Sequence, residues 1–288
     1  MKNKKITLSI LSFLIVLTII FGLIFFNLKN DNYLELTFFD VGQGDSTFIE
    51  TSHGYQILID GGPDSSVLEK LEKEMFSLDR TIDLIILSHP EHDHIAGLIE
   101  VLKRYEVGHI LWNGVDRDSS ELVEWNNLLE EKGTKVFIAK GDFKIYFGES
   151  EFLKVIYPFK SLEGELVEGA NETSIVFKLV FGETSFLFTG DISKEVEKDI
   201  LDKEIDVDAD VLKIAHHGSK YSTSEEFLIS ASPNSVVIFS GRDNSYGHPH
   251  PEVLELLNKY GINIFRTDLN GDIKLISDKN KVYGFSNI

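Results

Sequence analysis

The feature that most constrains this chain is the segment from Leu84 to Gly97, LIILSHPEHDHIAG. Its first four residues are apolar, as in a strand that is buried on both faces. Three histidines and two acids then crowd into the six residues His89–His94. At a strand end such groups repel one another or lose hydration, and a bound cation relieves both costs. The segment therefore predicts a metal site better than it predicts a polar loop that happens to be rich in histidine.

The absence of cysteine restricts the available chemistry. With none in 288 residues, the chain has no disulfide, thiolate ligand or cysteine nucleophile. Any metal must be held by His, Asp and Glu, which suits zinc or manganese. The sequence also lacks a Gly-rich phosphate loop and the Ser-x-x-Lys and Gly-x-Ser-x-Gly nucleophile motifs. We therefore expect one or two divalent ions to activate the attacking water.

An uncharged N-terminal segment, Ile6–Phe26, is long enough to span a membrane as a helix. Three lysines precede it, so the positive-inside tendency places the N-terminus in the cytoplasm. A cleaved signal peptide is the alternative, but the segment is long for one and no small-x-small cleavage site follows it. We expect residues 1–30 to form a cytoplasmic tip, a transmembrane anchor and a connector, with residues 31–288 as an extracytoplasmic domain at the cell membrane.

The expected outer domain is strongly acidic. Residues 1–30 hold four lysines and no acid, which leaves 24 basic and 47 acidic residues, a net charge of −23, in residues 31–288. This charge opposes non-specific attraction to nucleic acid or to anionic lipid. It does not exclude phosphate chemistry at a metal site, where the ion supplies the attraction locally.

Predicted strands and helices alternate along residues 33–288, and no break divides them into two domains. Three strands joined by glycine turns within residues 34–62 indicate an antiparallel meander. Helices are expected at residues 65–76, 95–105, 119–132, 193–201 and 223–230, and from Gly247 to Tyr260. Predicted strands end in ligand-type residues at Asp60, His89–His94, Asp191 and His216–His217. Layered sheets build active sites at one edge, so we expect these side chains to meet.

The order of these motifs resembles the metallo-β-lactamase superfamily: Asp60, then Ser88-His89-x-Glu91-x-Asp93-His94-x-x-Gly97, then Thr189-Gly190-Asp191. Four further motifs resemble the hydrolase domain of ComEC-type competence proteins, namely Asp40-Val41-Gly42-Gln43-Gly44-Asp45, Asn171-x-x-Ser174, His216-His217-Gly218-Ser219 and Gly247-His248-Pro249. The resemblance covers about residues 34–285. It implies an α/β (α+β) fold, a four-layer αββα sandwich with one or two metal ions at the sheet edge.

The resemblance also implies a set of ligands. Asp93 and His94 would bind one ion from a loop, with Asp191 bridging and either His216 or His217 completing the site. His89, with or without Glu91, would form the second position. His92 would point away, and Asp93 would also act in catalysis. For Asp191 the alternative role is the N-cap of the following helix.

The residues around these ligands carry further expectations. Asp60 would hydrogen-bond a ligand histidine and fix its tautomer. Asn171 stands where the superfamily usually has a histidine, just as Glu91 replaces the second histidine of the usual His-x-His-x-Asp-His motif. His248 and His250 are candidates to protonate a leaving oxygen or hold a phosphate, or are simply exposed at a helix start. Gln43 and Asp45 either line the pocket or only form a turn.

These features favour a membrane-anchored extracytoplasmic metallohydrolase. The first-choice substrate is a phosphodiester, with DNA as a candidate that the net charge disfavours. One alternative is a hydrolase of another bond, in a lactam, lactone, thioester or cell-wall phosphoester. Another is a metal-binding scaffold that lacks full catalysis because Asn171 replaces a histidine. ComEC-type channels have many membrane spans, whereas this chain has one candidate span, so the resemblance implies the hydrolase chemistry and not DNA transport.

Overall fold

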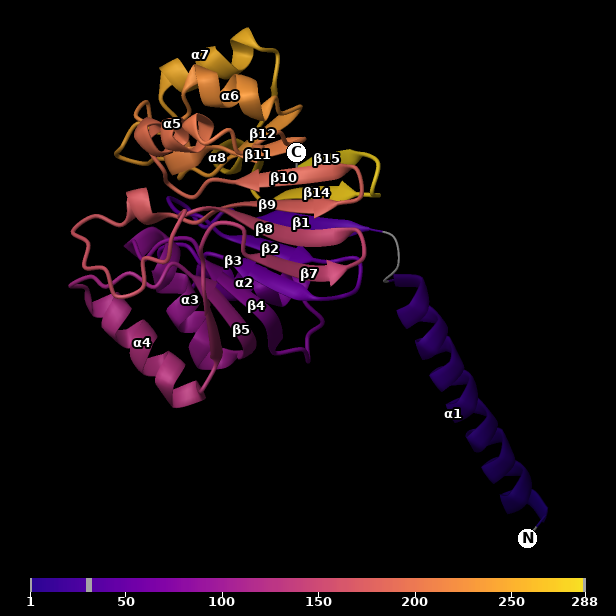
Figure 1. Ribbon diagram of the computed structural model, residues 1–288. Helices are drawn as coiled ribbons and strands as arrows, with labels where there is room; N and C mark the ends of the chain where they lie inside the picture. Colours follow the sequence, from indigo (N-terminus) through magenta and orange to yellow (C-terminus); the bar gives the residue numbers. More distant parts are fainter. Residues whose placement is uncertain (1, 30–32, 287–288) are drawn as a thin grey trace.

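The computed structural model describes residues 2–29 and 33–286, and it arranges the chain after Tyr33 as two β-sheets with helices on their outer faces (Figure 1). The first sheet has the strand order β15-β14-β1-β2-β3-β4-β5-β6, and the second has the order β13-β12-β11-β10-β9-β8-β7. The first sheet contains β1 (Leu34–Phe38), β2 (Thr47–Glu50), β3 (Gln56–Ile59), β4 (Thr81–Leu87), β5 (Glu106–Trp112), β6 (Lys135–Ile138), β14 (Ile273–Ser277) and β15 (Val282–Ser286). The second contains β7 (Lys144–Gly148), β8 (Glu151–Tyr157), β9 (Val176–Phe181), β10 (Thr184–Phe188), β11 (Val211–Lys213), β12 (Ser235–Ile238) and β13 (Asn263–Arg266).

Helices cover the outer face of each sheet, and three buried cores separate the layers. Side chains of both sheets, such as Phe38 and Phe177, form the central core. On the first sheet pack α2 (Ser66–Glu74), α3 (His92–Arg104) and α4 (Ser120–Lys132). On the second pack α5 (Lys194–Asp202), α6 (Glu225–Ala231) and α7 (Pro251–Lys259), and the short α8 (Thr267–Asn270) follows β13. The predicted four-layer αββα sandwich is confirmed.

Strand β4 shows why its sequence is a continuous apolar run. Leu84 and Ile86 belong to the core between the sheets, whereas Ile85 and Leu87 belong to the core under α2, α3 and α4. Because successive side chains of a strand point to opposite faces, a strand buried on both faces must be apolar at every position. The predicted strand and the antiparallel β1-β2-β3 meander are therefore both confirmed.

Helix α3 begins at His92, three residues earlier than the sequence predicted. Asp93 and His94 therefore lie in the first turn of a helix and not in a loop. The helix can approach the turn after β3 closely because both contacting residues are glycines. A Cβ atom on Gly97 would lie 1.9 Å from the carbonyl oxygen of Gly61. This contact sets the start of α3 beside the end of β3.

The N-terminal segment forms helix α1 (Lys2–Lys29), which extends away from the sandwich in Figure 1. Large apolar side chains on it are exposed, among them Ile10, Phe13 and Phe21. Within residues 2–29 and 33–286, no helix combines the length and apolar character that crossing a bilayer requires. The predicted transmembrane anchor is therefore not confirmed. The predicted boundary between residues 30 and 31 falls outside the described residues.

Candidate metal centre

The ligand-type residues predicted from strand ends meet at one edge of the sandwich. Asp60 follows β3, and His89 follows β4, its parallel neighbour. In the other sheet, Asp191 follows β10, and the short 3-10 turn Ala215–Gly218 follows the parallel strand β11. Because the carboxyl ends of parallel strands share an edge, the two sheets bring these side chains together.

His94 is oriented by the residues behind it. Its Nδ1 lies 2.9 Å from Oδ2 of Asp60, so Nδ1 carries the proton that the carboxylate accepts. Ser88 fixes that carboxylate in turn, because its backbone N–H donates to Oδ1 at 2.8 Å and its hydroxyl donates to Oδ2 at 2.7 Å. The Nε2 atom of His94 is buried without a hydrogen-bond partner. This nitrogen is therefore available to bind a metal, which agrees with the expected role of Asp60 in orienting a ligand histidine.

Four ligand atoms converge in front of this nitrogen. His94 Nε2 lies 3.5 Å from Asp191 Oδ2 and 3.9 Å from Asp93 Oδ1. His217 Nε2 lies 3.1 Å from Asp93 Oδ2 and 3.4 Å from Asp191 Oδ2. With metal–ligand bonds of about 2.0–2.2 Å, the ligands of a tetrahedral zinc ion lie roughly 3.3–3.6 Å apart. These four distances are near that spacing, and the cluster of Asp93, His94, Asp191 and His217, here called the main cluster, is the candidate site for one divalent ion. Ligand atoms of Asp45, His94 and His217 also lie within 4.8 Å of one another.

A second group of ligand atoms shares two members with the main cluster. Atoms of His89, His94 and Asp191 all lie within 4.8 Å of one another, and the three residues are buried. His89 Nε2 is a further buried nitrogen without a hydrogen-bond partner. The structure thus brings His89 to the place where a second ion would sit next to the first.

His216 and His217 lie in different surroundings. Both residues have a left-handed backbone, with φ of 48° and 54°. His217 is buried and joins the main cluster, whereas His216 faces the pocket and lies 3.5 Å from Asn171 Nδ2 through its Nε2. Of the two predicted alternatives, the geometry favours His217 as the ligand.

The other predicted residues lie as follows. Glu91 is engaged on both oxygens, since Oε2 lies 2.5 Å from Nη1 of Arg117 and Oε1 accepts the backbone N–H of Ala170 at 3.1 Å. Its role as a ligand stays a prediction. His92 is exposed, as expected. The N-cap of α5 is Ser193, so the alternative of Asp191 as a helix cap is wrong.

Two members of the site were missed or left open by the sequence. Lys213 is buried, and its ammonium group lies against Asp45 Oδ2, lies 3.2 Å from Asp191 Oδ1 and donates to the carbonyl oxygen of Gly190 at 2.8 Å. Asp45 also lies 3.3 Å from Nδ1 of His217 through Oδ1. The sequence did contain a signal for this pairing, because Lys213 lies in the otherwise apolar strand that leads into His216–His217. A lysine buried in such a strand is almost always paired with an acid.

The charges of the site depend on one another. Burial disfavours the charged form of His217, but Asp191, Asp45 and Asp93 outweigh it and raise its pKa to about 10. Burial also opposes charge on His94, yet Asp191, Asp60 and Asp93 hold its pKa well above the usual value. Burial, reinforced by the charge of His94, lowers the pKa of His89 to about 3. Without an ion, protons on His94 and His217 thus balance the carboxylates.

The main cluster opens into a pocket of about 260 Å³. Its lining residues are Gln43, Glu91, Asp93, Asn171, Asp191, His216, His217, Tyr246 and His248. Burial and the neighbouring histidines His217, His216 and His250 lower the pKa of His248 to about 4. His250 does not line the pocket; it is the N-cap of α7, and its ring lies 5.0 Å from that of His248. Of the two predicted histidines, only His248 faces the pocket.

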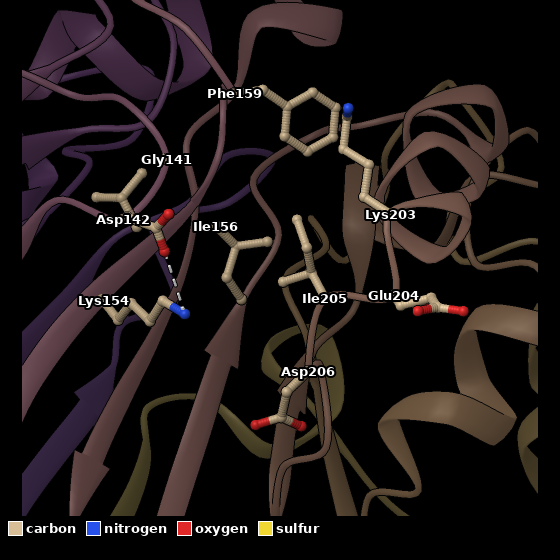
Figure 2. Close-up of a pocket in the computed structure, with 10 residues that line it drawn as sticks. Gly141, Asp142, Lys154, Ile156, Phe159, Lys203, Glu204, Ile205 and Asp206 are labelled. Atoms are coloured by element: carbon tan, nitrogen blue, oxygen red, sulfur yellow. Dashed lines mark ion pairs between the residues drawn. The ribbon is translucent and has the colours of Figure 1, made fainter.

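A larger pocket of about 530 Å³ lies elsewhere, between β8 and the loop after α5 (Figure 2). Two of its carboxylates are paired with lysines, Asp142 with Lys154 at 3.4 Å and Asp206 with Lys178 at 2.7 Å. Among the described residues, neither group of potential metal ligands belongs to it. The candidate site is therefore the smaller pocket.

The fold and site define the class of protein. The chain belongs to the metallo-beta-lactamase superfamily, whose sequence model matches residues 39–242. The likeness of structure agrees, since the metallo-beta-lactamase fold protein YhfI of Bacillus subtilis has a TM-score of 0.55 at 14% identity and covers 88% of this chain and 100% of that one. The family expected from the motifs is therefore confirmed.

The curated relatives include competence proteins. ComE operon protein 3 of Bacillus subtilis is 32% identical over 275 residues, 88% of this chain and 34% of that protein. Recombination protein 2 of Haemophilus influenzae is 28% identical over 283 residues, 96% of this chain and 33% of that protein. The chain thus spans about a third of the length of these relatives. Within the metallo-beta-lactamase superfamily, the chain is related to competence proteins.

Proposed function

We propose that this chain is a metal-dependent phosphodiesterase that acts outside the cytoplasmic membrane. The observation that carries the proposal is the convergence of Asp93, His94, Asp191 and His217 at the base of an open pocket. When bound there, a divalent ion such as zinc or manganese lowers the pKa of water to about 7 and polarises the bond that is attacked.

The chain's own residues orient and admit the reactants. Asp60 and Ser88 hold His94 with Nε2 toward the main cluster. The side chain of Asp93 is 31% exposed, so it is the cluster member most open to the pocket, where it can accept a hydrogen bond from an attacking water. With its pKa lowered to about 4, His248 is neutral at pH 7. A neutral imidazole holds a phosphate oxygen through an N–H group and is a weak proton donor, which favours binding over acid catalysis.

A phosphodiester fits better than the other substrates considered. The pocket is lined mainly by polar and titratable side chains, and with a metal ion bound against its carboxylates it suits an anionic group more than a lactam or thioester. The names of the two relatives, a protein of the ComE operon and a recombination protein, support a nucleic acid as the source of the phosphodiester. The net charge of −23 after residue 30 argues against tight, non-specific binding of long duplexes.

A panel of substrates tests the proposed activity. The purified full-length chain, loaded with zinc or with manganese, would be incubated with bis(p-nitrophenyl) phosphate, plasmid DNA, p-nitrophenyl phosphorylcholine and nitrocefin. We expect turnover of the phosphodiesters and none of nitrocefin. Turnover of nitrocefin alone would establish the alternative bond class. Bound metal without turnover of any substrate would favour the scaffold.

Placement outside the membrane, with Ile6–Phe26 as anchor, is the second part of the proposal, and its support is the sequence: an uncharged segment of 21 residues with three lysines before it. The chain has no cysteine, so a single cysteine at exposed Glu168 reports its side of the membrane without background. We expect a membrane-impermeant maleimide to label Glu168→Cys in intact cells from which the outer wall has been removed. Labelling only after the cells are broken would refute this placement.

A further inference from the structure

Tyr246 stands at the rim of the metal pocket with little to bury it. It lines the pocket, yet the residue is 66% exposed. One face of its ring stacks on His248, with ring centroids 5.7 Å apart and an interplanar angle of 18°. His248 lines the same pocket. The two rings thus form a flat platform whose outer surface faces solvent next to the candidate metal site.

The loop that carries this platform is fixed by one side chain. Asn244 donates from Nδ2 to the carbonyl oxygens of Gly241 and His248, at 2.9 and 2.7 Å. Its Oδ1 accepts the backbone N–H groups of Tyr246 and His248, at 3.2 and 3.0 Å. A ring held in place before binding loses little conformational entropy when a ligand stacks on it. The platform is therefore built for contact, and its exposure is not that of a mobile loop tip.

Two further aromatic residues extend from His248: the half-buried His250 and, through Lys220, the exposed Tyr221. The ring of His250 lies 5.0 Å from that of His248, and its Nδ1 accepts the backbone N–H of Lys220 at 3.3 Å. The ammonium group of Lys220 lies over the ring of Tyr221, 5.4 Å from its centroid, and Tyr221 is 68% exposed. Exposed aromatic rings beside a cation such as Lys220 form the kind of surface on which planar rings of a polyanion stack.

We propose that Tyr246, backed by His248, is a stacking subsite for a planar ring that the substrate carries next to the scissile phosphate, such as the base of a nucleotide. The proposal rests on the phosphodiesterase function proposed above and names its substrate class. A planar ring fits better than a quaternary ammonium group, because Tyr246 and His248 lie nearly parallel and offer one flat surface. Ammonium groups are instead enclosed by several aromatic faces.

Two substrates with one leaving group test the subsite. Thymidine 5′-(p-nitrophenyl phosphate) carries a base on the retained side, and methyl p-nitrophenyl phosphate does not. For Tyr246→Ser we expect KM for the thymidine ester to rise about tenfold, with kcat and the kinetics of the methyl ester unchanged. Tyr246→Phe should behave as the wild type. Tyr146→Ser is the matched control, because Tyr146 is 64% exposed on β7, outside the metal pocket.

Two kinetic outcomes would overturn the subsite. One is an equal change for both esters in Tyr246→Ser, and the other is an unchanged KM for the thymidine ester. A loss confined to p-nitrophenyl phosphorylcholine would assign the platform to a quaternary ammonium group instead.

Direct binding separates failure of the subsite from failure of the proposed activity. If neither ester is hydrolysed, the phosphodiesterase function fails. Calorimetric titration of the metal-loaded chain with thymidine 5′-monophosphate then decides the subsite alone. Binding about tenfold weaker in Tyr246→Ser than in the wild type supports the platform. Equal affinity, or no binding to the wild type, refutes it.

Discussion

The ammonium nitrogen of Lys213 lies 3.2 Å from Oδ1 of Asp191, while the other oxygen of that carboxylate faces His94 and His217. One oxygen of Asp191 is thus paired with the Lys213 ammonium group, and the other points to the candidate metal site. Lys213 also pairs with Asp45, so a single buried ammonium group links two carboxylates that come from different sheets.

Replacing this lysine should destabilise the metal-free protein. Lys213→Met removes the buried lysine that pairs with both Asp45 and Asp191, and losing one partner of a buried pair costs about 3–5 kcal/mol. Urea denaturation of the metal-free variant measures the loss. Lys178→Met is the control, because Lys178 pairs with a largely exposed Asp206 and should cost about 1 kcal/mol or less. If adding Asp45→Asn to Lys213→Met restores stability, unpaired charge is the cause of the loss. Equal stability of Lys213→Met and Lys178→Met would contradict the prediction.

The histidine pair offers a matched comparison of neighbours. His217 contributes Nε2 to the main cluster, whereas His216 faces Asn171. Asparagine tolerates the left-handed backbone at both positions, so each substitution can fold. We expect His217→Asn to lose the retained ion on dialysis and His216→Asn to keep it. Metal analysis of the dialysed variants decides between them, and the reverse result would move the ligand role to His216.

Metal binding should release protons. The pKa of His217 is raised to about 10 and that of His94 is also raised, so both keep a second proton at pH 7 in the metal-free site. A nitrogen that binds a metal must lose its proton. Metal affinity should therefore fall steadily as the pH decreases from 8 to 6. Zinc titrations in buffers of different ionisation enthalpy measure the released protons, for which we expect between one and two. Release of none would mean that these histidines are already neutral.

Much of the fold was predictable, since local pattern and burial agree. Leu84–Leu87 alternates between two apolar cores, so a continuous apolar run was the necessary signal. The early start of α3 was missed because His92, Asp93 and His94 carry no apolar periodicity. Their turn is formed by backbone hydrogen bonds from His94 and Ile95 to Glu91. It lies next to the close contact of Gly97 with Gly61, which is visible only in three dimensions.

The site was less predictable where it joins the two sheets. Asp45 and Lys213 are far apart in sequence, and nothing local connects a turn aspartate in one half to a strand lysine in the other. The choice between His216 and His217 depends on two consecutive left-handed residues, a backbone feature that their side-chain types do not specify. In contrast, Asp60, His89, His94 and Asp191 were predicted because each directly follows, or lies close behind, an apolar strand.

The two metal positions should differ in affinity. The main cluster has four protein ligands, whereas the position beside His89 shares Asp191 and has Asn171 where a histidine is usual. Only His89 belongs to the second position alone, because His94 and Asp191 are shared with the main cluster, so an ion there has fewer protein ligands and is held less tightly. A position that water must complete favours harder ions such as manganese. We expect one ion to remain after dialysis and activity to rise on adding manganese. Two equally retained zinc ions would show that the second position is complete without a histidine at residue 171.

The most direct test of the account is Asp191→Asn, because this carboxylate is common to both groups of ligands and to Lys213. The measurement is kcat/KM for bis(p-nitrophenyl) phosphate together with metal content, after circular dichroism has shown that the variant is folded. The account predicts a fall of about a hundredfold or more in kcat/KM and loss of the retained ion. Wild-type turnover with wild-type metal content would contradict the proposed metal centre.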